Sequence, residues 1–125
     1  MHEFSLIEGV LNMVRDSASQ NNIGKVNRVK LVVGRLSMAL PDSLHFAFEA
    51  ICKDEDLFRE AILEIEEKEI MCDCLACQRS SELKDIYSFI CPACGSNRIE
   101  ITQGRELYLD YYEGEEVNGA GSNGG

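Results

Sequence analysis

Residues 72–95 read CDCLACQRSSELKDIYSFICPACG and contain two pairs of cysteines with C-x-x-C spacing. Cys74 and Cys77 form the first pair, Cys91 and Cys94 form the second, and thirteen residues separate the pairs. Two intervening residues allow both thiolates of a pair to face one ion. The connecting loop lets the second pair complete a tetrahedron with metal–sulfur distances of about 2.3 Å. Gly95 follows Cys94, where a turn with positive φ would favour glycine. The stretch therefore predicts a small module organised around a metal ion.

Four thiolates leave no open coordination position, so the pattern predicts a structural zinc ion rather than a catalytic one. A rubredoxin-like iron site is the main chemical competitor, because four sulfur ligands suit both metals. The cysteines could also form a pair of redox dithiols or a set of inert buried thiols. Two C-x-x-C pairs in so short a segment favour the metal site over both.

Two further cysteines are not needed for the predicted tetrahedron. Cys72 lies two residues before Cys74, so C-x-C-x-x-C is an alternative ligand set. We favour Cys74 and Cys77 as ligands, because their C-x-x-C spacing matches that of the second pair. Cys52 falls near the end of a predicted helix and is interpreted as a small buried hydrophobic residue.

Length and charge narrow the class of protein. A chain of 125 residues corresponds to one domain, or to one domain with a small insert. The net charge of −10, from 22 acidic and 12 basic side chains, argues against a nucleic-acid partner. No apolar run approaches the length of a membrane span, and the first residues do not resemble a signal peptide. We expect a cytoplasmic protein, where reduced cysteines favour metal binding over disulfides.

The remaining sequence predicts alternating helices and strands. Apolar residues at helical spacing, including Phe4, Ile7 and Leu11 and widened by Met13, predict a first amphipathic helix. Its start is ambiguous, because Ser5 and Glu8 form a capping-box pattern whereas Phe4 favours an earlier start. Alternating apolar residues predict strands within 26–36, 61–70 and 99–113. A second helix is predicted within 38–53, with Leu44, Phe48 and Ile51 on its buried side.

The order of these elements predicts a small α+β domain with an inserted metal-stabilised module. We expect residues 1–70 and 104–113 to form the main domain and residues 71–103 to form the insert. The glycine-rich segment 114–125 lacks apolar periodicity and is predicted to be a disordered tail.

The first three residues, Met1, His2 and Glu3, offer a second metal site. The terminal amine, the amide nitrogen and imidazole of His2, and the Glu3 amide nitrogen supply four nitrogens, which in one plane suit Ni(II) or Cu(II) better than zinc. The alternative without a metal is that His2 is a frayed terminal residue and that Glu3 is an acidic residue that favours the start of a helix. His45 lies off the apolar stripe of its helix and is interpreted as solvated or partly buried.

Taken together, these residues resemble the HypA/HybF family of nickel metallochaperones for hydrogenase and urease maturation. The motifs that carry the resemblance are MHEFSL, LVVGRLS, SLHFAFE, the two C-x-x-C pairs and GRELYLDYYE. The resemblance implies an α+β fold class, with two helices packed on a three-stranded antiparallel sheet and an inserted zinc-ribbon-like module before the last strand.

The resemblance also implies the roles of the site residues and the partners. His2 would bind Ni(II) with the Met1 amine and backbone nitrogens, and Glu3 would support that site. Cys74, Cys77, Cys91 and Cys94 would hold structural Zn(II). The implied partners are a HypB-type GTPase and a [NiFe]-hydrogenase large subunit, with urease maturation proteins as a further client system. A homodimer is compatible with a hinged insert.

Three competing classes of function are weighed against a nickel carrier. The first is a zinc-ribbon adaptor that binds proteins and has no second metal. The second is an enzyme, which the closed cysteine set and the lack of a glycine-rich nucleotide loop argue against. The third is nucleic-acid binding through the ribbon, which the negative charge disfavours. We expect a nickel carrier that turns over no substrate.

Overall fold

The structure is a computed structural model that describes residues 3–117 of the chain. It contains two compact units. The helix unit comprises the described residues of Met1–Leu31, Ala39–Ile65 and Leu109–Gly125, and the cysteine unit comprises Val32–Met38 and Glu66–Tyr108. Within residues 3–117, no helix has the length and hydropathy that crossing a bilayer requires.

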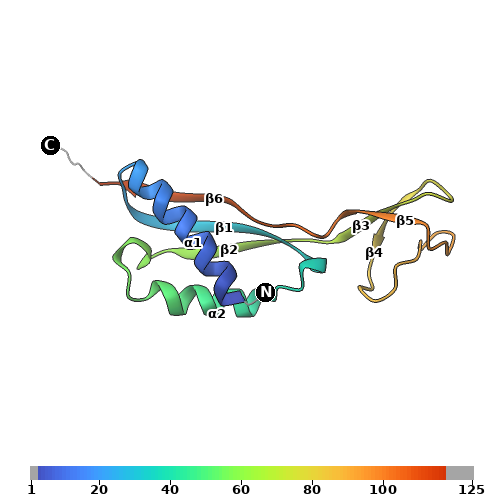
Figure 1. The fold of residues 1–125 in the computed structure, drawn as a ribbon, viewed down its shortest axis with the longest axis horizontal. Helices are drawn as coiled ribbons and strands as arrows, with labels where there is room; N and C mark the ends of the chain where they lie inside the picture. Colours follow the sequence, from blue (N-terminus) through green and yellow to red (C-terminus); the bar gives the residue numbers. More distant parts are fainter. Residues whose placement is uncertain (1–2, 118–125) are drawn as a thin grey trace. The chain divides into compact units, whose positions relative to one another are not determined.

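Helices and strands alternate up to residue 68, and residues 69–116 form further strands and no helix (Figure 1). Two helices and two short 3-10 turns are present in residues 3–117: α1 (Glu3–Gln20), η1 (Arg35–Ser37), α2 (Pro41–Cys52) and η2 (Asp56–Phe58). The described strands are β1 (Ile23–Gly34), β2 (Ile62–Lys68), β3 (Ile70–Cys74), β4 (Ser80–Leu83), β5 (Ile99–Gln103) and β6 (Leu107–Glu116).

Helix α1 begins at Glu3, which confirms the earlier of the two predicted starts. Its buried stripe is narrower than predicted, because Phe4 is 44% exposed and Met13 is 57% exposed. Each helical residue rotates by about 100°, so Met13 falls beyond the edge of the stripe. The residues that are buried are Ile7, Val10, Leu11, Val14 and Ala18.

Helix α2 begins with Pro41 at its first turn, where the missing N–H of proline costs no helical hydrogen bond. Leu44 and Phe48 are buried as predicted, whereas Ile51 is only half-buried. The stripe is completed instead by Ala47 and Cys52. Burial of Cys52 confirms its interpretation as a small hydrophobic residue.

The first sheet has the strand order β2-β1-β6. The prediction that all three strands are antiparallel was wrong, because β1 and β2 run in the same direction (Figure 1). Cross-strand pairs show this: Lys25 pairs with Glu60 and Arg28 pairs with Glu64, so the residue numbers rise together. Helix α2 connects these strands as a crossover, which lets neighbouring strands be parallel. Strand β6 is antiparallel to β1.

Charged side chains line the face of β1 that carries Arg28 and Lys30. Arg28 lies 2.5 Å from Glu64 on β2 and 3.3 Å from Glu113 on β6. Lys30 lies 3.8 Å from Asp110 on β6. The residues that alternate with these cations are buried: Val29, Leu31 and Val33.

Strand β6 extends to Glu116, three residues into the segment that composition predicted to be a tail. The Val117 amide donates a hydrogen bond of 2.7 Å to the Asn22 carbonyl. At Gly114 a Cβ atom would lie 2.6 Å from the carbonyl oxygen of Lys25, so glycine permits close approach of the backbones. The rest of the predicted tail, 118–125, lies outside the described residues.

The cysteine unit is built on the second sheet, with strand order β4-β3-β5 and β3 antiparallel to both neighbours. Ile70, Cys72 and Leu83 form its buried core, against which Leu36, Ile86, Ile99 and Ile101 pack. Leu36 comes from η1, far earlier in the chain. The unit is therefore wider than residues 71–103, and the predicted bounds of the inserted zinc-binding module stay a prediction.

Candidate metal centre

The four cysteines of the two C-x-x-C pairs lie together. The sulfur atoms of Cys74, Cys77, Cys91 and Cys94 are all within 4.8 Å of one another. The sulfurs of Cys74 and Cys94 are 3.6 Å apart, and those of Cys77 and Cys91 are 3.7 Å apart. All four are free thiols.

These separations fit a tetrahedral metal ion. Metal–sulfur bonds of about 2.3 Å in a regular tetrahedron give sulfur–sulfur edges of about 3.8 Å. The two measured edges are close to that value and far longer than a disulfide bond of about 2.05 Å. Four sulfur donors can hold Zn(II) or iron. With all four bound, no coordination position stays open for a substrate, so the centre suits a structural role.

The two knuckles have the same backbone construction. In the first, the Gln78 amide donates to the Cys74 carbonyl at 2.9 Å, and the Cys74 amide donates to the Arg79 carbonyl at 2.9 Å. In the second, Gly95 donates to Cys91 and Cys91 donates to Ser96, both at 2.8 Å. The residue after each second cysteine has a positive φ, 63° at Gln78 and 80° at Gly95. The turn predicted at Gly95 is confirmed, whereas Gln78 adopts it without a glycine as a signal.

Backbone amides point at the cysteine sulfurs and favour the thiolate form. The amide groups of Ala76 and Cys77 donate to the Cys74 sulfur at 3.3 and 3.4 Å. The Cys77 amide makes the largest contribution, and the pKa of Cys74 falls to about 6. The Cys94 amide likewise lowers the pKa of Cys91. Charge-assisted N–H···S bonds of this kind prepare the cluster for a cation.

The second cysteine of the first pair behaves differently. Although the Arg79 amide lowers it, burial and the neighbouring sulfurs raise the pKa of the Cys77 thiol to about 11. Four thiolates this close repel one another, so the metal-free cluster holds protons at neutral pH. A metal ion bound by these sulfurs would displace those protons, so its affinity would rise with pH.

Cys72 is not a member of the cluster. Its side chain is fully buried and packs with Ile70 and Leu83 in the core of the unit. Burial raises the pKa of its thiol. The alternative C-x-C-x-x-C ligand set therefore receives no support from the geometry.

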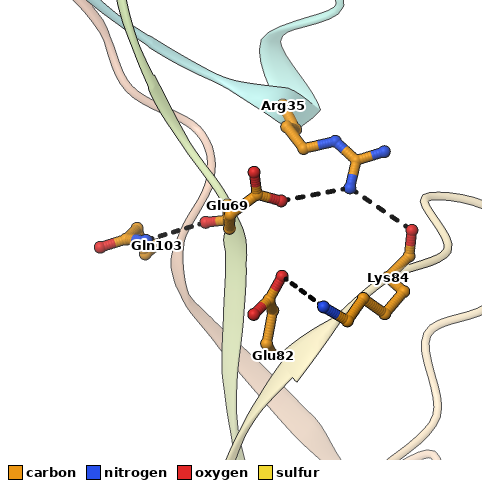
Figure 2. A network of polar contacts seen from close by, with 5 residues as sticks. All are labelled: Arg35, Glu69, Glu82, Lys84 and Gln103. Carbon is orange, nitrogen blue, oxygen red and sulfur yellow. Dashed lines mark hydrogen bonds and ion pairs between the residues drawn. The ribbon is translucent and has the colours of Figure 1, made fainter.

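A polar network beside β3 braces the same unit, and Figure 2 shows its members. Arg35 from η1 donates to the Glu69 carboxylate at 3.3 Å and to the Lys84 carbonyl at 3.4 Å. Gln103 on β5 donates to the Glu69 carbonyl at 2.9 Å. Three segments that are distant in sequence are thus tied to the start of β3. Sequence reasoning missed this network, because no motif links residues so far apart in the chain.

The second predicted metal site lies mostly beyond what the structure describes. Met1 and His2 are outside the described residues, so their predicted roles stay predictions. Glu3 is the first residue of α1 and is half-buried. It lines an open groove of about 520 Å³ in the helix unit, together with Phe4, Asp42, Ser43 and Phe46. His45 is half-buried, as its position off the apolar stripe predicted.

Comparisons with known proteins agree on one family. The family described as hydrogenase/urease nickel incorporation, metallochaperone, HypA, matches residues 1–114. The chain is 41% identical to hydrogenase maturation factor HypA of Moorella thermoacetica over 115 residues, which cover 92% of this chain and all of that protein. It is 38% identical to hydrogenase maturation factor HypA 2 of Bradyrhizobium diazoefficiens over 107 residues, covering 86% and 93%.

Solved structures show the same likeness in three dimensions. The solution structure of the nickel metallochaperone HypA from Helicobacter pylori aligns with a TM-score of 0.63 and 26% identity. The alignment covers 94% of this chain and all of that one. A second solution structure of a HypA protein aligns with a TM-score of 0.68, also at 26% identity, over 94% and 98% of the two chains.

Proposed function

This chain belongs to the HypA family of hydrogenase and urease nickel-incorporation metallochaperones, and we propose that it carries Ni(II) at its amino terminus to a [NiFe]-hydrogenase large subunit. The main support for the proposal is the four-cysteine cluster, which occurs here in a member of a nickel-metallochaperone family. A closed sulfur centre holds its metal tightly, so an exchanging nickel ion requires a different site. The chain itself turns over no substrate in this proposal.

We assign Zn(II) to the four-cysteine centre, with Cys74, Cys77, Cys91 and Cys94 as the ligands. The sulfur–sulfur distances and the amide hydrogen bonds to sulfur support this assignment. Zinc has no redox chemistry and a tetrahedral preference, so its role would be to order a unit whose apolar core is small. The small core of the cysteine unit, centred on Ile70, Cys72 and Leu83, fits that role.

We assign Ni(II) to nitrogens of Met1 and His2, with Glu3 supporting the site. A terminal amine, deprotonated amides and an imidazole form a nitrogen set that nickel favours over zinc. Glu3 lies in the first turn of α1, where backbone N–H groups have no acceptor within the helix, and this supports a role for its amide nitrogen. Nickel held by the terminal amine and imidazole can leave by ligand exchange, which a closed four-sulfur centre hinders.

The proposed partners are the HypB-type GTPase and the hydrogenase large subunit, with urease maturation proteins as a further client system. We assign this exchange to the cytoplasm, where reduced cysteines stay available for metal. The proposal also includes a homodimer of this chain, which nickel carriage does not require. Support for these partners is the family's description as a hydrogenase/urease nickel-incorporation factor.

A transfer experiment tests the proposal. Untagged protein would be loaded with radioactive nickel, freed of excess metal and mixed with the nickel-free large-subunit precursor in the presence of a nickel chelator. We expect radioactivity to move to the large subunit from the wild-type chain and not from His2→Ala. Equal transfer from both chains, or from chelated nickel alone, would contradict the proposal.

A further inference from the structure

An exposed aromatic pair lies in the helix unit beside the start of α1. The rings of Phe4 and Phe46 meet edge to face, with centroids 6.4 Å apart and an interplanar angle of 75°. Phe4 is 44% exposed and Phe46 is 68% exposed. The two rings line the groove of about 520 Å³ that also includes Glu3, Asp42 and Ser43. In Figure 1 the first turn of α1 lies next to the first turns of α2.

Core packing does not account for Phe46. Phe48 lies two residues further along α2, on the opposite side of the helix, and is 3% exposed. Phe46 therefore points away from the core that Leu44 and Phe48 enter. Phe4 continues the apolar stripe of α1 for one turn before Ile7, where the core no longer covers it. Exposed aromatic rings that converge on a groove are typical of a protein–protein contact.

The charge of the groove indicates what kind of peptide segment could bind there. Its ionisable lining residues are Glu3 and Asp42, both acidic. The helix unit that surrounds the groove is acidic too. The cysteine unit, 32–38 and 66–108, has eight of the chain's 22 acidic residues and six of its 12 basic ones, which leaves 14 acidic and six basic residues in the helix unit. An apolar floor with an acidic rim fits a segment that presents an aliphatic or aromatic side chain next to Lys or Arg. A volume of this size accommodates one or two such side chains.

We propose that the Phe4–Phe46 groove docks such an apolar–basic segment of the nickel acceptor, the hydrogenase large subunit. The choice of acceptor rests on the proposed function. Glu3 belongs both to the groove and to the proposed nickel site, so a protein bound in the groove lies beside that site. Docking there converts nickel exchange between two molecules into exchange within one complex.

Calorimetric titration of the nickel-free large-subunit precursor tests the proposal, using the full-length chain, Phe46→Ser and Met13→Ser. Met13 is a matched control, since it is 57% exposed on α1 and does not line the groove. We expect Phe46→Ser to raise the Kd at least about tenfold and Met13→Ser to leave it unchanged. Asp42→Asn should make the Kd less sensitive to added salt, because it removes a rim charge.

Two outcomes would overturn the inference: no binding of the precursor by the wild-type chain, or an unchanged Kd for Phe46→Ser. Nickel stoichiometry, measured on the same samples, separates this inference from the proposed function. A wild-type chain that docks through Phe46 but holds no nickel would refute nickel carriage and leave the docking site in place. Circular dichroism of Phe46→Ser checks that its helices are retained.

Discussion

At the scale of single residues, Cys72 and Cys74 have different environments although they lie on the same strand. Cys74 faces the sulfurs of the metal cluster and accepts hydrogen bonds from two backbone amides. Cys72 packs among aliphatic side chains and is fully buried. One cysteine therefore belongs to the proposed metal centre, whereas the other belongs to the apolar core.

This difference predicts opposite results for two substitutions. Cys72→Ala should keep one zinc per chain and lower the free energy of unfolding by about 1–2 kcal/mol, because it removes a buried sulfur. Cys77→Ser should lose zinc, since three thiolates cannot close the tetrahedron as tightly. Elemental analysis after gel filtration measures both. Zinc loss in Cys72→Ala with zinc retained in Cys77→Ser would reverse our assignment.

A second residue-scale feature is the ion pair between Arg15 on α1 and Glu55. Two hydrogen bonds of 2.8 and 2.7 Å join the guanidinium to the carboxylate. Arg15 also lies over the Phe58 ring, 5.4 Å from its centroid. The hydrogen bond from Arg15 is the main cause that lowers the pKa of Glu55. Both side chains keep about a third of their surface in solvent, so screening limits the energy.

The lowered pKa of Glu55 predicts how stability depends on pH. A carboxyl whose pKa is lower in the folded chain stabilises above its unfolded value, about 4.3, and loses that contribution as the pH falls through the folded value. Glu55→Gln should therefore lower the free energy of unfolding by about 1 kcal/mol at pH 7 and by much less at a pH below the folded value. Urea titrations compare it with Glu49→Gln, an exposed position on α2. If the loss of free energy of unfolding caused by Glu55→Gln became larger as the pH falls, this account would be refuted.

Sequence reasoning identified residues whose role follows from local spacing. The four cysteines whose sulfurs cluster and the positive φ of Gly95 are of this kind, because the C-x-x-C spacing and a glycine after the second pair are local patterns. It did not identify the Arg35–Glu69–Gln103 network or the Phe4–Phe46 pair. Both join residues more than thirty positions apart, and only the folded chain brings such residues together.

At the scale of elements, glycines allow two backbones of the cysteine unit to touch. Gly34 at the end of β1 donates to the Glu106 carbonyl at 2.7 Å, and Leu36 donates to the Gly104 carbonyl at 2.7 Å. A Cβ on Gly34 would overlap the carbonyl of Gly104. Gly104 has a φ of 128°, a conformation that favours glycine. The contact therefore depends on the absence of side chains.

Two glycine substitutions should have opposite effects for this reason. Gly34→Ala should lower the free energy of unfolding by about 1–3 kcal/mol, because backbone atoms cannot move aside as a flexible side chain can. Gly9→Ala in α1 has open space around its Cβ and should raise it by about 0.5–1 kcal/mol through helix propensity. Urea unfolding followed by circular dichroism measures both. A neutral Gly34→Ala would show that the close approach is not required.

Element types were predictable from periodicity, whereas strand direction was not. Alternating apolar residues indicate a strand whichever way its neighbour runs. The parallel pairing of β1 and β2 follows from the crossover through α2, which the order helix–strand–helix–strand allowed but did not require. The extension of β6 to Glu116 was missed because glycine and acidic residues carry little strand propensity.

At the scale of the whole molecule, the chain divides its charge and its chemistry between two units. The cysteine unit contains the closed sulfur centre and nearly balanced charges, whereas the helix unit contains the start of α1 and most of the acidic residues. In the proposed function the cysteine centre keeps its metal ion, whereas the amino terminus exchanges nickel. The central claim is that nickel binds at the amino terminus and not at the cysteines.

Metal stoichiometry after nickel loading tests that claim most directly. The samples are the untagged chain, His2→Ala, a chain with one residue added before Met1, and Cys94→Ser. We predict one zinc and one nickel in the first, zinc without nickel in the second and third, and loss of zinc in the fourth. Nickel bound equally by the untagged chain, His2→Ala and the extended chain would contradict the account, because the amino terminus would then not be the site that carries nickel.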